Sequence, residues 1–369
     1  MGVVLKELSI KLDGTDGKHI SSFSQSKAPD VEEETFESIE DYTLLKVIGR
    51  GSFGKVFLAE SNETKTLYAI KVVNKDFVIR GNDVDTIMTE RNVLKLGVRN
   101  PFLTNLHSTF QNSSSLFFVM EYVCGGDLMF HIMEEGRFSL ERAKFYAAEI
   151  VLAFQFLHRK GIIYRDLKLD NIMLDSEGHI KLTDFGMCKE GIKNGRTTST
   201  FCGTPVNMAP EIIREEEYSI GVDWWTLGIL IYGMLVGHSP FHDENEDRLF
   251  EIIKREAPFF PPNIDVNSKR IIRGLLQKDP NQRLGCPPQS EEAIKEQQFF
   301  KGIKWDELQY KRSKPPFIPA EGERRNADNF DLEFTSEPVE MSVSDARSSA
   351  SETGYQEEFR GFDYVNNKV

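Results

Sequence analysis

Three chemically different side chains occur within one short stretch, YRDLKLDN at residues 164–171. Asp166 can accept the proton of an attacking hydroxyl, Lys168 can neutralise a phosphoryl group during transfer, and Asn171 can bind a hard cation through oxygen. Asp184 follows 18 residues after Asp166, in a DFG run behind the short strand HIKLT, and offers a second oxygen ligand. Each residue alone could fill a turn, but the set in this order is specific for phosphoryl transfer.

A glycine-rich stretch, IGRGSFGKV from Ile48 to Val56, could bind phosphate through its backbone. The same glycine spacing occurs in dinucleotide-binding turns, which require a strand before the glycines and a helix after them. Here the following residues, KVFLA, alternate as a second strand, so the glycines form the tip of a hairpin. Their backbone amides could approach a phosphate closely while Phe53 covers the loop. A plain glycine-rich hairpin is the alternative.

Lys71 stands inside an apolar strand, in YAIK. A buried lysine is costly unless it is paired. Glu90 is available on the next predicted helix, where Ile87, Val93 and Leu94 make the same face apolar. Lys71 could then hold two phosphates while Glu90 holds Lys71. A lysine that points to solvent would explain Lys71 alone, and a glutamate on the helix surface would explain Glu90 alone. This alternative is a poor explanation for the two residues together.

The elements that must position these residues begin with strands. Short alternating runs at 42–48, 55–61 and 66–73 predict consecutive antiparallel strands joined by glycine or polar turns. The apolar run at 115–123 predicts a buried strand. Between them, the pattern at 84–97 predicts a helix that ends at a glycine.

The second part of the chain is rich in helical patterns. After Cys124-Gly125-Gly126, the stretch 140–161 is long, amphipathic and closed by a glycine. The stretch 221–237 is nearly apolar all round, which indicates a core helix rather than a membrane span. The three prolines of 314–320 predict an extended strap. This order predicts an α+β fold, a small antiparallel β lobe hinged to a large α-helical lobe.

The net charge of −13 over 369 residues is concentrated at the two ends. Residues 1–41 hold 10 acidic and 4 basic side chains and residues 321–369 hold 12 and 5, so the span between them is neutral. Nucleic acid is not expected as a partner, because phosphate binding needs a basic face. The acidic ends could equally be solvated tails. Four cysteines without paired spacing, and no apolar run long enough to cross a bilayer, predict a reduced cytoplasmic protein.

Together these motifs resemble the eukaryotic protein kinases, and within them the group that includes cyclic-nucleotide-dependent kinases and protein kinase C. Tyr164 in place of the commoner His, the run FCGTP and a C-terminal extension with PPF carry this resemblance. The runs FFVMEYV, GGDLMFHI, GIIYRDLKLDNIMLD and DFGMCKE are most similar to the diacylglycerol-responsive, calcium-independent branch of protein kinase C. The resemblance covers residues 42–365, and the Cys- and His-rich regulatory modules of that family are not expected in this chain.

The resemblance implies transfer of the γ-phosphate of ATP, with two Mg²⁺ ions, to serine or threonine in protein substrates. Lys168, where tyrosine kinases carry a different pattern, indicates serine and threonine. The catalytic set would comprise Asp166, Lys168, Lys71 and Glu90, with Asn171 and Asp184 as metal ligands.

For ATP, the resemblance implies that Met120 guards the space behind adenine and that the backbones of Glu121 and Val123 bind the adenine edge. Asp127 would reach the ribose. Met120 and Met173 could also be ordinary core methionines. The implied ATP-binding residues are Ile48, Gly49, Gly51, Ser52, Phe53, Gly54, Val56, Ala69, Lys71, Met120, Glu121, Val123, Asp127 and Met173.

Regulatory positions also follow from the resemblance. Thr200, just before FCGTP, stands where the family carries an activating phosphate, which would pair with Arg165. Ser342 in EMSVSD matches a second phosphorylation site, the turn motif, although Val343 replaces the usual proline.

The run FRGFDY at 359–364 matches the hydrophobic motif that packs on the small lobe in the resembling family. Its aromatic residues are Phe359, Phe362 and Tyr364. Asp363 stands where a phosphorylatable residue is usual and supplies permanent negative charge. We expect this tail to dock without phosphorylation there; an apolar tail with an incidental acid is the alternative.

Substrate recognition is where the chain departs from the family it resembles. The family normally carries Tyr at the position of Asn207 and Glu at that of Gly233, two side chains that meet and help to read a basic residue. Both are absent, so we expect a weakened preference for a basic residue at −2, with acceptance at −3 retained. Local instability without new specificity is the alternative. The implied substrate contacts are Asp127, Asp170, Thr204 and Met208.

A catalytically impaired pseudokinase acting as a binding scaffold is the competing hypothesis. It requires the loss of a catalytic residue, and none is lost. We therefore expect an active, monomeric kinase for basic protein substrates, activated by an upstream kinase at Thr200. Because no membrane-binding module is expected in this chain, we expect partners, or regulatory modules outside it, to recruit the kinase to membranes. The predicted organisation is an acidic linker (1–41), a kinase domain (42–300, lobes 42–122 and 123–300) and a C-terminal extension (301–369).

Overall fold

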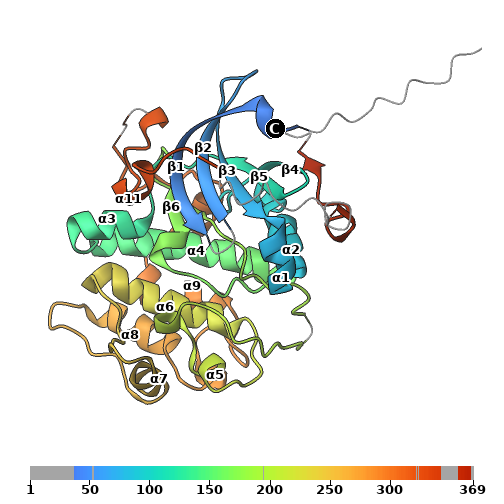
Figure 1. The fold of residues 1–369 in the computed structure, drawn as a ribbon. Helices are drawn as coiled ribbons and strands as arrows, with labels where there is room; N and C mark the ends of the chain where they lie inside the picture. The colour runs from blue at the N-terminus through green and yellow to red at the C-terminus, as the bar shows by residue number, and fades with distance from the viewer. Residues whose placement is uncertain are drawn as a thin grey trace, which may run out of the picture. The chain divides into compact units, whose positions relative to one another are not determined.

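The computed structural model describes residues 37–51, 54–193, 195–320, 322, 324–341 and 356–366. All of them belong to the compact unit Phe36–Val369. Ser52, Phe53 and Ser342, and all but the last residues of the predicted acidic linker, lie outside the described residues. The described part of the chain consists of an antiparallel sheet followed by a helical lobe, which confirms the predicted α+β architecture (Figure 1).

The small lobe is built on a six-stranded antiparallel sheet in the order β1-β2-β3-β5-β4-β8. Burial does not alternate strictly along these strands, because the consecutive residues Phe57–Glu60 of β2 are all buried and both faces of the sheet are therefore covered there. The last strand comes from the C-terminal end of the chain and pairs with β4 at the sheet edge. The strands are β1 (Tyr42–Gly51), β2 (Gly54–Ser61), β3 (Leu67–Asn74), β4 (Leu106–Gln111), β5 (Ser115–Glu121) and β8 (Tyr364–Val365).

Two helices pack beside this sheet. The predicted helix is α2 (Val84–Leu94), which ends three residues earlier than expected because Gly97–Arg99 forms a separate 3-10 turn. Helix α1 (Lys75–Gly81) was not predicted from the sequence. It begins where the side chain of Asn74 accepts a hydrogen bond from the backbone N–H of Phe77.

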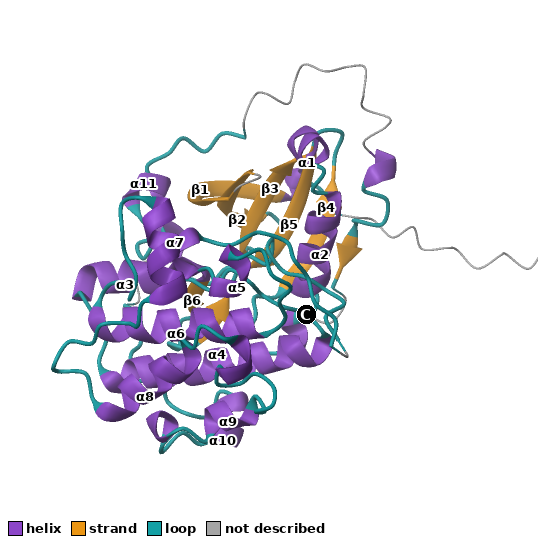
Figure 2. Ribbon diagram, turned by 90° about the horizontal axis from the view of Figure 1, so that it is seen from below, coloured by secondary structure: helices purple, strands orange, loops and turns teal. Residues whose placement is uncertain are grey.

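The large lobe is helical and contains one two-stranded sheet, β6–β7 (Figure 2). Its longest helix, α4, begins where Ser139 accepts a hydrogen bond from the N–H of Arg142, and it ends at Gly161 in a left-handed conformation. The elements are α3 (Leu128–Glu135), α4 (Leu140–Lys160), β6 (Ile172–Leu174), β7 (Ile180–Leu182), α5 (Pro210–Ile213), α6 (Gly221–Val236), α7 (Glu246–Arg255), α8 (Val266–Leu275), α9 (Glu292–Lys295) and α10 (Trp305–Gln309).

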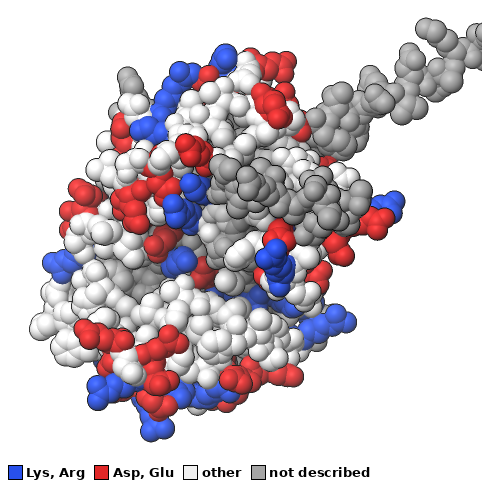
Figure 3. Space-filling model, viewed as in Figure 1, with Lys and Arg blue, Asp and Glu red and all other residues white. Residues whose placement is uncertain are grey.

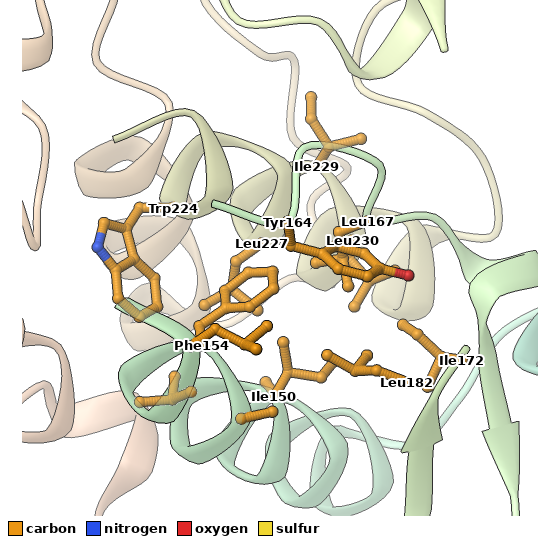
Figure 4. Close-up of a cluster of buried hydrophobic side chains, with 14 of the residues drawn as sticks. Ile150, Phe154, Tyr164, Leu167, Ile172, Leu182, Trp224, Leu227, Ile229 and Leu230 are labelled. Carbon is orange, nitrogen blue, oxygen red and sulfur yellow. The ribbon is translucent and has the colours of Figure 1, made fainter. Parts of the chain in front are cut away.

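The core of the large lobe lies where α4 and α6 meet (Figure 4). Phe154 of α4 contacts the ring of Trp224 edge-on at 5.6 Å and the ring of Tyr164 at 5.9 Å. Every residue of α6 from Gly221 to Leu235 is buried, which confirms the prediction of a core helix. Among the described residues, no helix combines the length and apolar character that crossing a membrane requires. The segment 164–171 packs on this core, and its residues Tyr164 and Leu167 are buried in it.

The C-terminal extension contacts both lobes. In the predicted strap, Phe317 stacks on the guanidinium of Arg142 at 3.7 Å, and Phe138 covers the other side at 3.9 Å. Further on, the extension carries the one-turn helix α11 (Leu332–Thr335) and then β8. The extension therefore belongs to the folded unit.

Candidate active site

A cavity of about 190 Å³ opens where the sheet meets the large lobe. Its walls come from β1, β2 and β3 on one side and from β6 and the segment after β5 on the other. Gly54 and Asp127, which were expected in the same site, do not line it. Of the implied ATP-binding residues, those on its walls are Ile48, Gly49, Gly51, Val56, Ala69, Lys71, Met120, Glu121, Val123 and Met173.

A buried cation stands at the inner end of this cavity. The Nζ atom of Lys71 on β3 lies 2.6 Å from a carboxylate oxygen of Glu90 on α2 and 3.4 Å from one of Asp184. The side chains of Lys71 and Glu90 are 8% and 2% exposed. Burial lowers the pKa of Lys71, but the two carboxylates outweigh it and raise that pKa above its usual value. The lysine is therefore held protonated between the two carboxylates.

Asp184 on the cavity wall and Arg165 in the segment 164–171 both have unusual backbone geometry. Asp184 has φ of 48° and Arg165 has φ of 71°, both in the left-handed region that non-glycine residues rarely adopt. Such strained conformations cluster at functional sites. The ammonium of Lys71 lowers the pKa of Asp184, which keeps this carboxylate ionised at the cavity wall.

The segment 164–171 presents its polar side chains together. One oxygen of Asp166 accepts a hydrogen bond from the Thr204 hydroxyl at 3.0 Å, and the other accepts from the Asn171 amide at 2.9 Å. The Lys168 Nζ atom lies 3.2 Å from the same carboxylate. The segment is fixed from below by buried Asp223, whose carboxylate accepts the backbone N–H groups of residues 164 and 165.

A second buried ion pair braces the large lobe. Arg283 bonds both oxygens of Glu211 at 2.5 and 2.8 Å, and it also donates to the backbone carbonyl of Gly221 at 2.9 Å. Both side chains are almost completely buried. The pair holds GTPVNMAPE (203–211) against the start of α6, so Thr204 reaches Asp166 from a fixed backbone.

The positions that depart from the expected pattern lie beside this segment. Met208 is buried and Asn207 is half-buried at the end of a short 3-10 turn. A Cβ atom added to Gly233 on α6 would approach no atom closer than 4.0 Å, its neighbours being Leu169 and His238. The structure thus leaves room for a Cβ atom at Gly233.

Hydrogen bonds define the surroundings of Thr200, the predicted phosphorylation site, and of Arg165, its expected partner. Thr200 is exposed, while Arg165 is buried and donates to the Tyr218 hydroxyl at 3.0 Å and to the carbonyl of Met187 at 2.5 Å. The Tyr218 hydroxyl in turn donates to the carbonyl of Thr200 at 2.7 Å. One tyrosine therefore joins the predicted phosphorylation site to the residue beside Asp166.

Comparison with known families agrees with this geometry. Residues 42–300 match the protein kinase domain, and residues 327–364 match the protein kinase C terminal domain. The chain belongs to the protein kinase family. The second match and the curated relatives show that the chain is similar to protein kinase C. Neither comparison favours the pseudokinase alternative.

Several curated relatives of this kinase are named protein kinase C. A "Protein kinase C" of Drosophila melanogaster is 52% identical over 90% of this chain and 44% of its own length. A "Protein kinase C-like 1B" of Caenorhabditis elegans is 49% identical over 95% of this chain and 49% of its own. A "Protein kinase C zeta type" of Oryctolagus cuniculus is 46% identical over 98% and 60%. The chain thus spans about half the length of these relatives, and the assignment to one branch stays a prediction.

The kinase cavity also contains residues that sequence reasoning missed. Phe330, from the C-terminal extension, lines the cavity and stacks on Tyr122 with ring centroids 5.8 Å apart. The only signal in the sequence was an isolated aromatic in a polar stretch, which gives no indication of its contact 208 residues away. Others on the walls are Arg50, Leu94, Thr104, Tyr122 and Thr183.

Proposed function

We propose that this chain transfers the γ-phosphate of ATP to serine and threonine side chains of proteins. The observation that carries the proposal is that a buried lysine and two carboxylates meet at one cavity. Lys71, held by Glu90, faces Asp184, and Asp166 is linked to them through Lys168, which lies 3.2 Å from Asp166 and also lowers the pKa of Asp184. A protein kinase domain implies ATP as a substrate. A positioned cation and a positioned carboxylate are the parts that phosphoryl transfer needs, because the reaction depends on orientation and charge stabilisation.

The nucleotide would be held by the cavity walls. Apolar side chains of Val56, Ala69 and Met173 line it from both lobes and suit a planar base. The chain segment Glu121–Val123 supplies backbone groups at one edge for the adenine. Lys71 would bind phosphate oxygens, and its own carboxylate partner keeps it in place and charged.

Asn171 and Asp184 suit Mg²⁺, because both present the oxygen ligands that this ion prefers. The Asn171 amide nitrogen donates to Asp166, so its carbonyl oxygen is turned to the other side. The Asp184 side chain is 44% exposed at the cavity wall. Two Mg²⁺ ions bound there would neutralise charge on the phosphates.

Asp166 would orient the substrate hydroxyl and accept its proton. Lys168 lies on the same carboxylate and would accompany the phosphoryl group, while Thr204 fixes the carboxylate from the other side. The leaving and entering oxygens would thus be flanked by Lys71 and Lys168, with no covalent step on the protein.

Protein substrates with basic residues near the target are proposed from the carboxylates beside this site. Burial raises the pKa of Asp127 to about 6, with Asp170 nearby adding to the effect. A basic substrate side chain would restore the ionised form and gain its charge–charge attraction. The face in Figure 3 carries several groups of acidic side chains that could attract a basic peptide.

Exposed Thr200 is proposed as the residue that an activating kinase phosphorylates. A cytoplasmic location is proposed from the cysteine usage.

The test is transfer of radiolabelled phosphate from ATP to a basic peptide by the purified chain. Replacing Asp166 by Ala should lower kcat by about 100-fold or more, since general-base catalysis contributes at that scale. An Asp306→Ala variant, which removes an exposed carboxylate on α10, is the matched control and should keep full activity. ATP binding without transfer by the wild type, with Thr200 phosphorylated by intact mass, would support the scaffold alternative instead.

A further inference from the structure

One buried lysine plays no part in the proposed chemistry. Lys181 on β7 is 7% exposed and does not line the cavity. Its Nζ atom lies 2.7 Å from a carboxylate oxygen of Glu121 and 3.3 Å from the backbone oxygen of Leu103. A lysine so deeply buried needs compensating partners, and it finds them outside its own lobe.

Glu121 is the last residue of β5, where the chain leaves the small-lobe sheet for the large lobe. The oxygen that binds Lys181 also accepts the backbone N–H of Asn105 at 2.7 Å, and the Glu121 N–H donates to the Asn105 carbonyl at 3.0 Å. One carboxylate therefore joins three segments: the end of β5, the loop before β4, and β7.

The loop before β4 is itself attached to β7. Thr104 donates to the carbonyl of Leu182 through its N–H at 3.0 Å and through its hydroxyl at 2.8 Å. The N–H of Leu182 donates to the carbonyl of Phe102 at 2.8 Å. The loop and β7 therefore form one block, and the Lys181–Glu121 ion pair is its charged contact with the segment that links the lobes.

We propose that Lys181 is a positioning residue that latches the interlobe segment to β7 and thereby slows release of the nucleotide product. The inference rests on the proposed function, since the residues after Glu121 line the cavity in which ATP would bind. Nucleotide leaves when the two lobes separate, and opening motions of this kind commonly limit kcat. Rotation about the segment at Glu121 would break this half-buried ion pair, in which Lys181 is buried and Glu121 is 32% exposed, so the latch opposes separation.

The proposal is tested by the dissociation rate of a fluorescent ADP analogue, chased with ATP in a stopped-flow instrument. Lys181→Met should release the analogue about 10-fold faster, as expected for about 1.4 kcal/mol lost from the closed state. Its kcat should become less sensitive to solvent viscosity, which a purely structural defect would not produce. Lys181→Arg keeps the charge and should restore slow release, and Lys301→Met, at an exposed lysine, should behave as wild type.

A second variant protects the test against a folding defect. Glu121→Gln keeps the shape of the side chain, retains an acceptor for the Asn105 N–H and removes the charge. It should show the same fast release, and the double variant should add little, because both changes break one interaction. Release at the wild-type rate from folded Lys181→Met or Glu121→Gln overturns the latch. Failure of the proposed function is distinguishable, since it would abolish phosphate transfer while nucleotide release stays measurable.

Discussion

His158, near the end of α4, is a buried histidine held between two carboxylates. Its Nε2 atom lies 2.7 Å from Asp223 on α6, and its Nδ1 atom contacts Glu291 just before α9. The rings of Phe154 and Trp224 enclose the remaining faces. Burial lowers its pKa, but hydrogen bonds to both carboxylates outweigh that and raise the pKa to about 9. The residue is therefore an imidazolium at neutral pH. It contacts Asp223, the carboxylate that accepts the backbone N–H groups of residues 164 and 165.

This shift predicts a pH-dependent contribution to stability. The folded pKa lies above the unfolded value near 6.5, so the stabilisation is complete below pH 6.5 and is lost as pH rises through 9. The difference corresponds to about 3 kcal/mol. Glu291→Gln should lower the free energy of unfolding most near pH 6 and hardly at pH 10, measured by urea denaturation. Glu296→Gln, at an exposed carboxylate just after α9, is the control; equal losses from Glu291→Gln at all pH values would contradict the assignment.

Gly233 and Asn207 carry a prediction about substrate choice. A Cβ atom at Gly233 would make only ordinary contacts, at 4.0 Å from Leu169 and from the backbone of His238, so a substitution can begin there without a backbone clash. The wild type should select arginine at −2 only weakly on a peptide array. The double variant Asn207→Tyr/Gly233→Glu should gain that selection by on the order of tenfold, the scale of one charged hydrogen bond. Gly233→Ala is the volume control, and strong −2 arginine selection by the wild type would refute the idea.

At the scale of elements, the sequence predicted those helices and strands that depend on residues close together in the chain. The 3.6-residue periodicity and the closing glycine located the helix that ends at Lys160, and strand alternation located β1 to β3. Helix α1 was missed because its seven residues are too few to show periodicity. The pairing of β8 with β4 was not predictable, because a two-residue strand gains its hydrogen bonds only from an edge more than 250 residues away. Phe330 entered the cavity for the same non-local reason.

The docked position of β8 suggests what Asp363 does. Phe359 and Phe362 are fully buried, and Phe362 meets Phe118 edge-on at 5.2 Å. The Asp363 carboxylate accepts a hydrogen bond from Gln111 at 2.8 Å, and the Gln111 carbonyl accepts one from Lys75 at 2.8 Å. The acid therefore completes a polar chain beside two buried aromatics.

Asp363→Lys should release this tail, since it places a cation near Lys75 and breaks the bond to Gln111. We expect a drop of a few degrees in Tm, equivalent to about 1–2 kcal/mol, and a lower kcat/KM. Glu357→Lys makes the same charge reversal at an exposed site of the same segment and should leave both unchanged. Unchanged Tm and activity in Asp363→Lys would show that the tail docks through its aromatics alone.

At the scale of the whole molecule, the C-terminal extension connects the two lobes from outside. It stacks Phe317 on Arg142 of the large lobe, bonds the carbonyl of Cys124 through Asn329 at 3.0 Å, and pairs Glu337 with Arg50 on β1 at 2.8 Å. Between these contacts it places an aromatic side chain at the mouth of the cavity. Because Phe330 lines the cavity, we expect the path of the extension to affect nucleotide affinity as well as stability.

Phe330→Ala separates those two roles. Removing the ring exposes Tyr122 and opens one wall of the cavity, so KM for ATP should rise about fivefold, as expected for about 1 kcal/mol of lost apolar contact. The value of kcat should change little, because Asp166 and Lys71 keep their partners. Phe317→Ala deletes the same side chain from the same extension at a point away from the cavity. It should lower Tm while leaving KM for ATP near the wild-type value. Equal effects of both variants on KM would mean that the extension acts on ATP only by holding the lobes together, and that the ring of Phe330 contributes nothing of its own.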